Sequence, residues 1–239
     1  MGTELTLWPG GPVFLPAPHA PLGTDSILLA DFVRAAGAKR GVDLGCASGI
    51  LSLLLLWREP GLHMTGLELN SSAAELARKN MARNALSARS AMLAGDIREH
   101  RSLLPAGGFD LAVSNPPYFP LGGGALSPDA ARAAARGETD CSLEELCAAA
   151  AWLLRTGGSF FLVYRPERLA ELFCRMSAAG LEPKRLRLVC HRAESRPSLA
   201  LVEGRRGGKP GLSIEPALVM TDAQGQESAE IRRIYHRDR

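Results

Sequence analysis

The stretch with the clearest chemical potential is Asn115-Pro116-Pro117-Tyr118-Phe119. It follows the apolar run 109–113, which is typical of a buried strand. Two consecutive prolines lack the N–H groups that a sheet or the interior of a helix requires, so the strand must end there. Asn115 is therefore expected at a strand's carboxyl end, where open α/β sheets bind their ligands. An amide, a rigid carbonyl at Pro116 and the ring of Tyr118 suit a planar ligand that carries an NH2 group. The structural alternative is a strand-ending turn with a polar cap and a packing aromatic.

A glycine-rich turn follows an earlier predicted strand and precedes the helical run 50–57. Gly45 and Gly49 lack a Cβ, so the backbone can turn tightly and approach a ligand. The amino end of the next helix favours an anionic or hydrogen-bonding group. Asp43, at the end of the strand, is expected to accept a hydrogen bond from a ligand amine. An acid two residues before the first glycine is absent from the dinucleotide fingerprint, which argues against that reading.

Two further acids are predicted at the same edge of the sheet. Glu68 ends the second strand, 19 positions after Gly49, which is the place of an acid that binds a ribose diol. Asp96 closes a third strand. Because the carboxyl ends of parallel strands meet at one edge, Asp43, Glu68 and Asp96 are expected to converge. For Glu68 the alternative is a surface acid at a strand end.

The rest of the chain reads as alternating strands and helices around these motifs. Residues 1–22 read as an irregular arm, and Gly23-Thr24-Asp25-Ser26 offers cap residues for a helix that ends near Gly37. Strand-like segments 183–192 and 197–203 leave no room for a helix between them and are expected to pair as an antiparallel hairpin. Further helices are expected over residues 71–81, capped by Ser71 and Ser72, over 142–154, stopped by Gly157-Gly158, and over 166–179.

Composition limits the classes of function. The chain has 239 residues, 46% of them hydrophobic, and a net charge of +3, which fits one domain and permits nucleic acid as a partner. Five cysteines without a CxxC pair and five scattered histidines favour a reducing compartment and no metal site. The apolar runs are too short to span a bilayer, and no signal peptide is recognised. We therefore expect a cytoplasmic protein with no membrane contact and no obligate protein partner.

Two other segments are candidates for contact with a phosphate backbone. The connection 120–140 reads as a substrate lid in which Arg136 contacts a phosphate, with a solvated helix as the alternative. Residues 184–209 hold eight basic and two acidic side chains, and Lys209 ends that segment. The alternative for this segment is a charged edge that discourages strand pairing.

The motifs together resemble those of the class I S-adenosylmethionine (SAM) methyltransferases. The segment 43–49 is similar to their motif I, with Ala47 in place of its middle glycine, where a methyl group is expected to crowd the cofactor. Glu68 resembles their ribose-binding acid, Asp96 the acid that faces the adenine, and 115–118 the motif of amine and amide methylation. The resemblance implies an α/β, Rossmann-like fold: a seven-stranded, mostly parallel sheet with a C-terminal antiparallel β-hairpin. It also implies one globular unit, with an arm and helix in 1–40 packed on a methyltransferase domain, 41–239.

Within this class the chain most resembles the bacterial tRNA1(Val) adenine-37 N6-methyltransferases, almost from end to end. The matching segments include 23–29, 135–138, 164–169 and 207–212. The resemblance implies methyl transfer from SAM, without a metal, to the N6 amine of a tRNA adenine, with S-adenosylhomocysteine as product. Catalytic roles fall on Asn115, Pro116 and Tyr118. Substrate contacts fall on Pro117, Tyr118, Phe119, Arg136 and Lys209. Cofactor contacts fall on Thr24, Asp25, Asp43, Gly45, Ala47, Gly49, Glu68, Leu69, Asp96, Ile97 and Asn115.

Four other functions remain open at this point. A protein-glutamine N5-methyltransferase shares the Asn-Pro-Pro-Tyr motif, but such enzymes usually carry a helical N-terminal domain, and only about 40 residues precede motif I here. A guanine-N2 rRNA methyltransferase tends to have Phe after the prolines and a duplicated domain. A nicotinamide-dependent oxidoreductase conflicts with the acid before Gly45 and with the hairpin. An RNA-binding module with a decayed cofactor site is the alternative that is not an enzyme.

Overall fold

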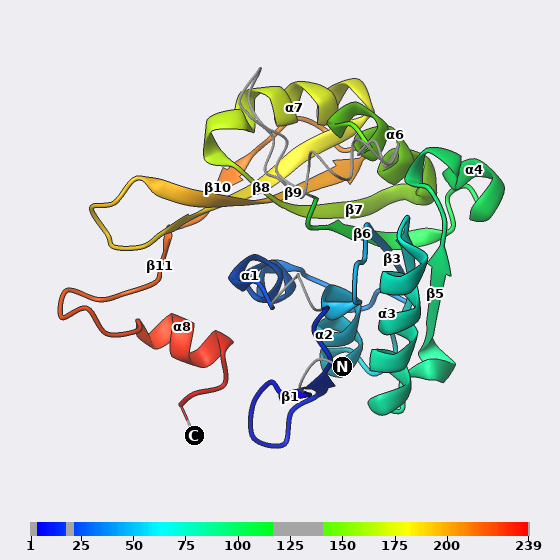
Figure 1. Cartoon of the computed structure of the whole chain (residues 1–239). Helices are drawn as coiled ribbons and strands as arrows, with labels where there is room; N and C mark the ends of the chain where they lie inside the picture. The colour runs from blue at the N-terminus through cyan, green and yellow to red at the C-terminus, as the bar shows by residue number, and fades with distance from the viewer. Residues whose placement is uncertain (1–3, 18–21, 117–140, 239) are drawn as a thin grey trace, which may run out of the picture.

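A single mixed sheet forms the centre of the molecule in the computed structural model, which describes residues 4–17, 22–116 and 141–238 (Figure 1). The strand order is β10-β8-β9-β7-β6-β3-β4-β5, and β11 also pairs with β8. Strands β3 to β7 run parallel, whereas β9 is antiparallel to β7 and to β8. The strands are β3 (Arg40–Leu44), β4 (His63–Glu68), β5 (Ser90–Ala94), β6 (Phe109–Ser114), β7 (Leu154–Tyr164), β8 (Leu181–Cys190), β9 (Pro197–Arg206), β10 (Ser213–Ile214) and β11 (Leu218–Val219).

The predicted fold class is confirmed, with one addition. Strands β3 to β9 form the expected seven-stranded sheet that ends in an antiparallel hairpin. The two-residue strands β10 and β11 extend it by pairing parallel with β8. Their segment was not predicted as strand, because two residues are too few to show an alternating pattern.

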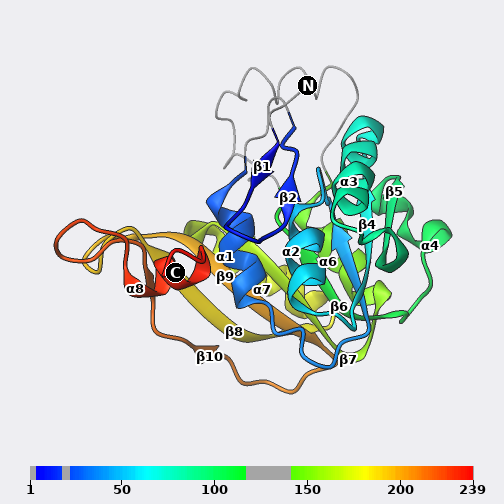
Figure 2. The same cartoon turned by 90° about the horizontal axis from the view of Figure 1, so that it is seen from below.

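Helices cover both faces of the sheet (Figures 1 and 2). One face carries α1 (Thr24–Phe32), α2 (Ile50–Arg58) and α3 (Ser71–Arg83), which lie below the sheet in Figure 1. The other carries α6 (Leu143–Leu153), α7 (Leu169–Ala178) and the short α4 (His100–Leu103). Short 3-10 turns span 87–89, 97–99 and 166–168. Each face has its own buried apolar cluster, as expected when parallel strands are covered on both sides.

Three local predictions are wrong, each for a specific reason. The N-cap of α1 is Gly23, one of the four residues predicted to cap it, but the helix ends at Phe32 rather than near Gly37. The N-cap of α3 is Asn70, whose Oδ1 accepts from the backbone of Ser72 and Ala73, so the cap lies just before Ser71.

The glycine pair also has a different role from the one predicted. Helix α6 begins with the capping box of Ser142 and Glu145 but ends at Leu153, and the chain enters β7 directly. A Cβ on Gly158 would lie 2.9 Å from the carbonyl oxygen of Arg155, and the β6–β7 register shifts beside it. The glycines therefore permit an irregularity in a strand rather than ending a helix.

Both ends of the described chain pack on the α1 face. Strands β1 (Leu5–Thr6) and β2 (Val13–Phe14) form a hairpin. The Asn84 side chain accepts a hydrogen bond from the Val13 amide and donates one to the Val13 carbonyl. Phe14 is buried in the core beside α1. Helix α8 (Ala229–Ile234) contributes Ile231 and Ile234 to the same core. The arm predicted to be irregular thus contains a hairpin, which side chains of α3 and its C-cap anchor to the core.

Much of the basic segment 184–209 is used inside the fold. Arg185 is buried, donates to Glu203 Oε2 at 2.7 Å and to Glu215 Oε1 at 2.9 Å, and lies over the ring of Phe32. Arg187 forms a two-bond pair with Glu230. These arginines hold the C-terminal segment to β8, so the segment is not a uniform basic surface.

We predict that Arg185→Met lowers the free energy of unfolding by about 3–5 kcal/mol, because Glu203 would keep a buried carboxylate without its main cation. Urea denaturation measures this change. The double variant Arg185→Met/Glu203→Met should recover most of the loss, since apolar replacement of a buried pair is often neutral. The exposed Arg192→Ala serves as control and should stay within about 0.5 kcal/mol of the wild type. A single-variant loss below about 1 kcal/mol would contradict the assignment.

Candidate active site

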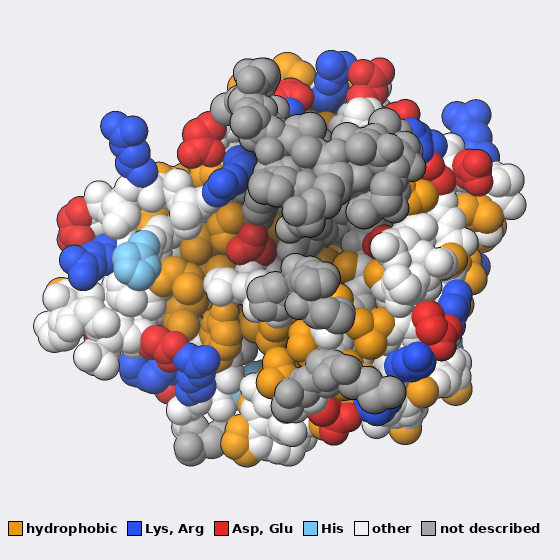
Figure 3. Space-filling view, viewed as in Figure 1, with side chains coloured by type: hydrophobic (Ala, Val, Ile, Leu, Met, Phe, Trp, Pro, Cys, Tyr) orange, Lys and Arg blue, Asp and Glu red, His pale blue; other side chains and the backbone are white. Residues whose placement is uncertain are grey.

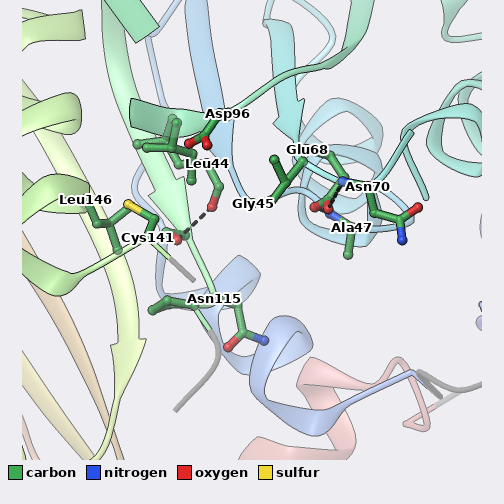
Figure 4. Close-up of a pocket in the computed structure, with 13 residues that line it drawn as sticks. Leu44, Gly45, Ala47, Glu68, Asn70, Asp96, Asn115, Cys141 and Leu146 are labelled. Carbon is green, nitrogen blue, oxygen red and sulfur yellow. Dashed lines mark hydrogen bonds between the residues drawn. The ribbon is translucent and has the colours of Figure 1, made fainter. Parts of the chain in front are cut away.

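A cavity of about 430 Å³ opens at the carboxyl ends of β3, β4 and β6 (Figure 4). It brings together residues from strand ends that are far apart in the sequence, as the parallel order requires. Its lining comprises Leu44, Gly45, Ala47, Glu68, Leu69, Asn70, Asp96, Ile97, Ser114, Asn115, Pro116, Cys141 and Leu146. Eight of the predicted site residues are therefore adjacent here: Gly45, Ala47, Glu68, Leu69, Asp96, Ile97, Asn115 and Pro116.

The turn after β3 leaves space for a ligand at Gly45. This residue has φ +74°, and a Cβ built on it would meet no atom within 4 Å, so its outer side faces open space. Ala47 has φ +47°, a conformation that costs an alanine roughly 1 kcal/mol relative to glycine. Gly49 has φ +84°, and a Cβ there would lie 3.0 Å from Ala77 Cβ. The glycine at 49 is thus required by packing against α3, and it does not line the cavity.

Glu68 stabilises the turn and faces the cavity at the same time. Its Oε2 accepts from the Ala47 amide at 2.8 Å, and its Oε1 accepts from the Asn70 amide at 2.9 Å. Each oxygen of an ionised carboxylate has a further lone pair, so both can still accept from vicinal hydroxyl groups. The carboxylate is held by two backbone donors and is therefore oriented before a diol binds.

Asp96 and two apolar side chains form another wall. Asp96 accepts from the backbone of Arg98 at 2.8 Å and from its guanidinium, and this hydrogen bonding lowers the pKa of the carboxyl group. Asp96 is thus held as an ionised acceptor. Leu69 and Ile97 line the same cavity and offer apolar surface for a planar ring. A carboxylate acceptor beside apolar side chains fits a purine with an exocyclic amine.

Asp43 is not where the sequence suggested. It is fully buried and does not line the cavity; its Oδ2 accepts from the Ser52 amide and hydroxyl, at 3.2 and 2.8 Å. Burial raises the pKa of this carboxyl group to about 7, against the lowering effect of the Ser52 hydrogen bonds. Its Oδ1 has no hydrogen-bond partner among the described residues. Strand β3 directs Asp43 toward α2, so direct contact with a ligand amine would require this carboxylate to become exposed.

Asn115 is positioned by contacts from two different elements. Ser114 Oγ donates to the Leu44 carbonyl at 2.7 Å, which ties the end of β6 to β3. Asn115 Nδ2 donates to Ser26 Oγ on α1 at 3.0 Å, and Ser26 is buried. In Figure 4 the Asn115 amide is turned toward α1. Because its NH2 group is held by Ser26, the oxygen Oδ1 is left as the acceptor that Asn115 can present to a ligand.

The remaining predicted residues lie elsewhere. Thr24 and Asp25 line a second cavity with Arg165 and His191, so their contact with the cofactor stays a prediction. Lys209 follows β9, which runs antiparallel to β7, so it lies at the opposite edge of the sheet from Asn115. Its substrate contact also stays a prediction. The predictions for Pro117, Tyr118, Phe119 and Arg136 lie outside the described residues.

Sequence reasoning missed six contributors to the site, and three of them, Leu44, Asn70 and Ser114, line the cavity next to predicted residues. Ser26 was read as part of a helix start, and its role depends on a contact across 89 residues that no local pattern shows. Cys141 and Leu146 reach the cavity from the start of α6. Within the described residues, no group of three metal-ligating side chains occurs. None of the helices in the described ranges is long and apolar enough to cross a membrane.

Comparison with known sequences places the chain among methyltransferases. Residues 19–177 match the family described as "methyltransferase small domain". A tRNA1(Val) (adenine(37)-N6)-methyltransferase of Porphyromonas gingivalis is 35% identical over 190 residues, which cover 77% of this chain and 74% of the relative. The protein of the same name from Tolumonas auensis is 32% identical over 210 residues, with 87% and 85% covered.

Solved structures show the same architecture. A predicted O-methyltransferase from Agrobacterium tumefaciens aligns with a TM-score of 0.73 and 22% identity, covering 89% of this chain and 96% of that one. The 16S rRNA N2 G1207 methyltransferase of T. thermophilus, in complex with AdoMet and guanosine, aligns with a TM-score of 0.58 and 22% identity. That alignment covers 86% of this chain and 50% of the other. At this identity, the two structures support the fold.

The buried carboxyl of Asp43 gives a testable pH dependence. The pKa of this group is raised on folding, so its contribution to stability is present at acidic pH and is lost as pH rises from about 4 to about 7. In Asp43→Asn this titration is absent. The free energy of unfolding of the variant should therefore rise relative to the wild type between pH 5 and 7, by up to about 1.4 kcal/mol per pH unit.

Urea denaturation at several pH values measures this difference. Asp110→Asn is the control, because hydrogen bonds from Arg155 and from the backbone lower the pKa of Asp110 despite its partial burial. Its variant should differ from the wild type by a constant amount between pH 5 and 8. Parallel pH curves for Asp43→Asn and the wild type would show that Asp43 is ionised when folded.

Proposed function

The chain belongs to the methyltransferase small domain family, and from this premise we propose that it transfers a methyl group from SAM to the exocyclic N6 amine of an adenine in tRNA. The observation that carries the proposal is the anchored Asn115 amide, which shares one cavity with Glu68 and Asp96. An acceptor for an amine thus lies in the cavity that fits a nucleoside cofactor. The relatives' name supplies the substrate class, since they are tRNA1(Val) (adenine(37)-N6)-methyltransferases.

The residues that line the cavity fit SAM as the cofactor. Glu68 would accept from the ribose diol, and Asp96 from the adenine amine, with Leu69 and Ile97 against the ring. The open side of Gly45 leaves room for the amino-acid portion beside the turn. When bound, SAM supplies an activated methyl group on a sulfonium, so the protein does not have to activate the methyl donor.

The protein's task is then to make an aromatic amine nucleophilic. The lone pair of this nitrogen is delocalised into the ring, which makes it a poor nucleophile. Asn115 Oδ1 and the Pro116 carbonyl each accept one N–H, which favours a pyramidal nitrogen and aims its lone pair at the methyl group. These two acceptors would hold the nitrogen in position to attack the methyl group that bound SAM would supply. The amine can lose its proton after the bond forms, so no strong base is required.

The proposed target is an adenine of the anticodon loop, at position 37 as in the relatives' name. A base in a loop is easier to extract from its stack than one in a duplex. Stacking on Tyr118 would contribute about 1–3 kcal/mol toward that cost. A tRNA substrate also supports a cytoplasmic location. The relatives favour adenine over the glutamine and guanine substrates that the Asn-Pro-Pro-Tyr motif alone leaves open.

A direct experiment identifies the product. The protein is incubated with methyl-labelled SAM and bulk tRNA, the RNA is digested, and the nucleosides are separated. We expect the label in N6-methyladenosine. Label in guanosine derivatives, or only in protein, would contradict the proposed substrate.

We predict that Asn115→Ala lowers kcat on the order of 100-fold or more, because the amine loses an oriented acceptor in the transition state. Ser26→Ala should lower kcat roughly tenfold, since the amide is still present but no longer held by α1. Both variants should leave the dissociation constant of SAM within about twofold of the wild type.

Single-turnover methylation and calorimetric titration with SAM measure the two effects separately. Ser102→Ala, an exposed serine on α4, is the matched control and should keep full activity. Near-wild-type turnover in Asn115→Ala would remove this residue from the mechanism. A Ser26→Ala variant that loses SAM affinity and activity together would indicate a general structural role instead.

A further inference from the structure

A second cavity, of about 310 Å³, opens at the same edge of the sheet as the first. It lies between the start of α1 and the strand ends of β7, β8 and β9. Figure 3 shows hydrophobic side chains gathered in a hollow in this region, with charged side chains around it. Its lining includes Thr24, Asp25, Leu28, Arg165, His191 and Ser198.

Helix α1 links this cavity to the candidate active site. Ser26 holds the Asn115 amide, while its sequence neighbours Thr24 and Asp25 line the second cavity. Arg165 follows the end of β7, the strand adjacent to β6, and lies three residues beyond Leu162, the β7 partner of Ser114. The two cavities therefore lie at the same edge of the sheet and are linked through α1.

The chemistry of the lining suits a nucleotide. The Arg165 guanidinium matches phosphate oxygens in a two-bond arrangement, and His191 can donate a further hydrogen bond. Asp25 accepts and the hydroxyl of Thr24 both donates and accepts, which suits the polar edge of a base. Leu28 and Leu199 supply apolar surface for the base itself. Arg192 and Arg196, in the β8–β9 turn, add positive charge beside the opening.

We propose that this cavity binds a nucleotide of the tRNA strand that flanks the target adenosine, with Arg165 and His191 on its phosphate and Asp25 on its base. The proposal rests on the proposed function and adds a second contact with the same substrate. The nucleotide next to the target adenosine would thus contact α1 and the ends of β7, β8 and β9. Lys209, at the opposite edge of the sheet, would not contact it. Helix α1 also holds Asn115 through Ser26. The same helix therefore contacts the nucleotide in this cavity and orients the catalytic amide.

The test compares variants in tRNA methylation under steady-state conditions. Arg165→Gln removes the charge, and Arg165→Lys retains it. Ser198→Trp fills the cavity from an exposed position and leaves Arg165 in place. Arg101→Ala, an exposed arginine on α4, is the matched control.

Arg165→Gln should raise the KM for tRNA about tenfold, with kcat and the dissociation constant of SAM within twofold of the wild type. The slope of log affinity for tRNA against log salt concentration should fall in magnitude by about 0.7 to 1, as for one lost phosphate contact. Ser198→Trp should raise KM similarly without changing that slope. Arg165→Lys should recover part of the loss, and Arg101→Ala should match the wild type.

The outcomes separate this inference from the proposed function. If the wild type methylates tRNA but Arg165→Gln and Ser198→Trp both keep KM and the salt slope unchanged, only the second binding site is overturned. If the wild type neither binds nor methylates tRNA, both proposals are overturned. A parallel loss of SAM affinity and kcat in Arg165→Gln and Ser198→Trp would show that the cavity belongs to the cofactor site instead, and would also overturn the inference.

Discussion

The hydrogen bond from Asn115 Nδ2 to Ser26 Oγ is the interaction on which the account of this site depends. An amide at a strand end can rotate, and its oxygen and nitrogen then exchange places. In the structure the buried hydroxyl of Ser26 accepts from the nitrogen, which anchors the amide on α1 and leaves the oxygen as the acceptor. The distinction matters because only the oxygen can accept a hydrogen bond from a substrate amine. The amide is thus anchored by a helix far from Asn115 in the sequence.

This dependence gives the peripheral segments a role in the site. Helix α1 packs against α2 and α8 in one apolar core, and Arg233 of α8 pairs with Asp31 of α1 at 3.0 Å. Phe14 of the N-terminal hairpin is buried in the same core. Segments outside the central sheet therefore fix the helix that fixes the amide. On the other side of the cavity, backbone amides of Ala47 and Asn70, in the turns after β3 and β4, orient the Glu68 carboxylate.

Sequence reasoning located the parts of the site that strand ends determine. Glu68, Asp96 and Asn115 lie together because parallel strands place their carboxyl ends at one edge, which alternation of apolar runs and turns reveals. It failed where side-chain direction or long-range contacts decide. Asp43 lies at a strand end but faces α2, and no pattern of residue types distinguishes that direction. The position of Lys209 at the opposite edge follows from the hairpin, whose second strand returns there, while its substrate contact stays a prediction. Arg185 looked like surface charge because its partners, Glu203 and Glu215, are 18 and 30 residues away.

A crystal structure with S-adenosylhomocysteine and a tRNA anticodon stem-loop would show whether Asn115 contacts the target amine. The quantity to measure is the distance from Asn115 Oδ1 to the N6 atom of the extruded adenine. The account predicts a hydrogen bond of about 2.8–3.2 Å, with Asn115 Nδ2 still on Ser26. An adenine amine more than about 4 Å from Asn115 Oδ1, or an Asn115 side chain turned away from the base, would contradict it.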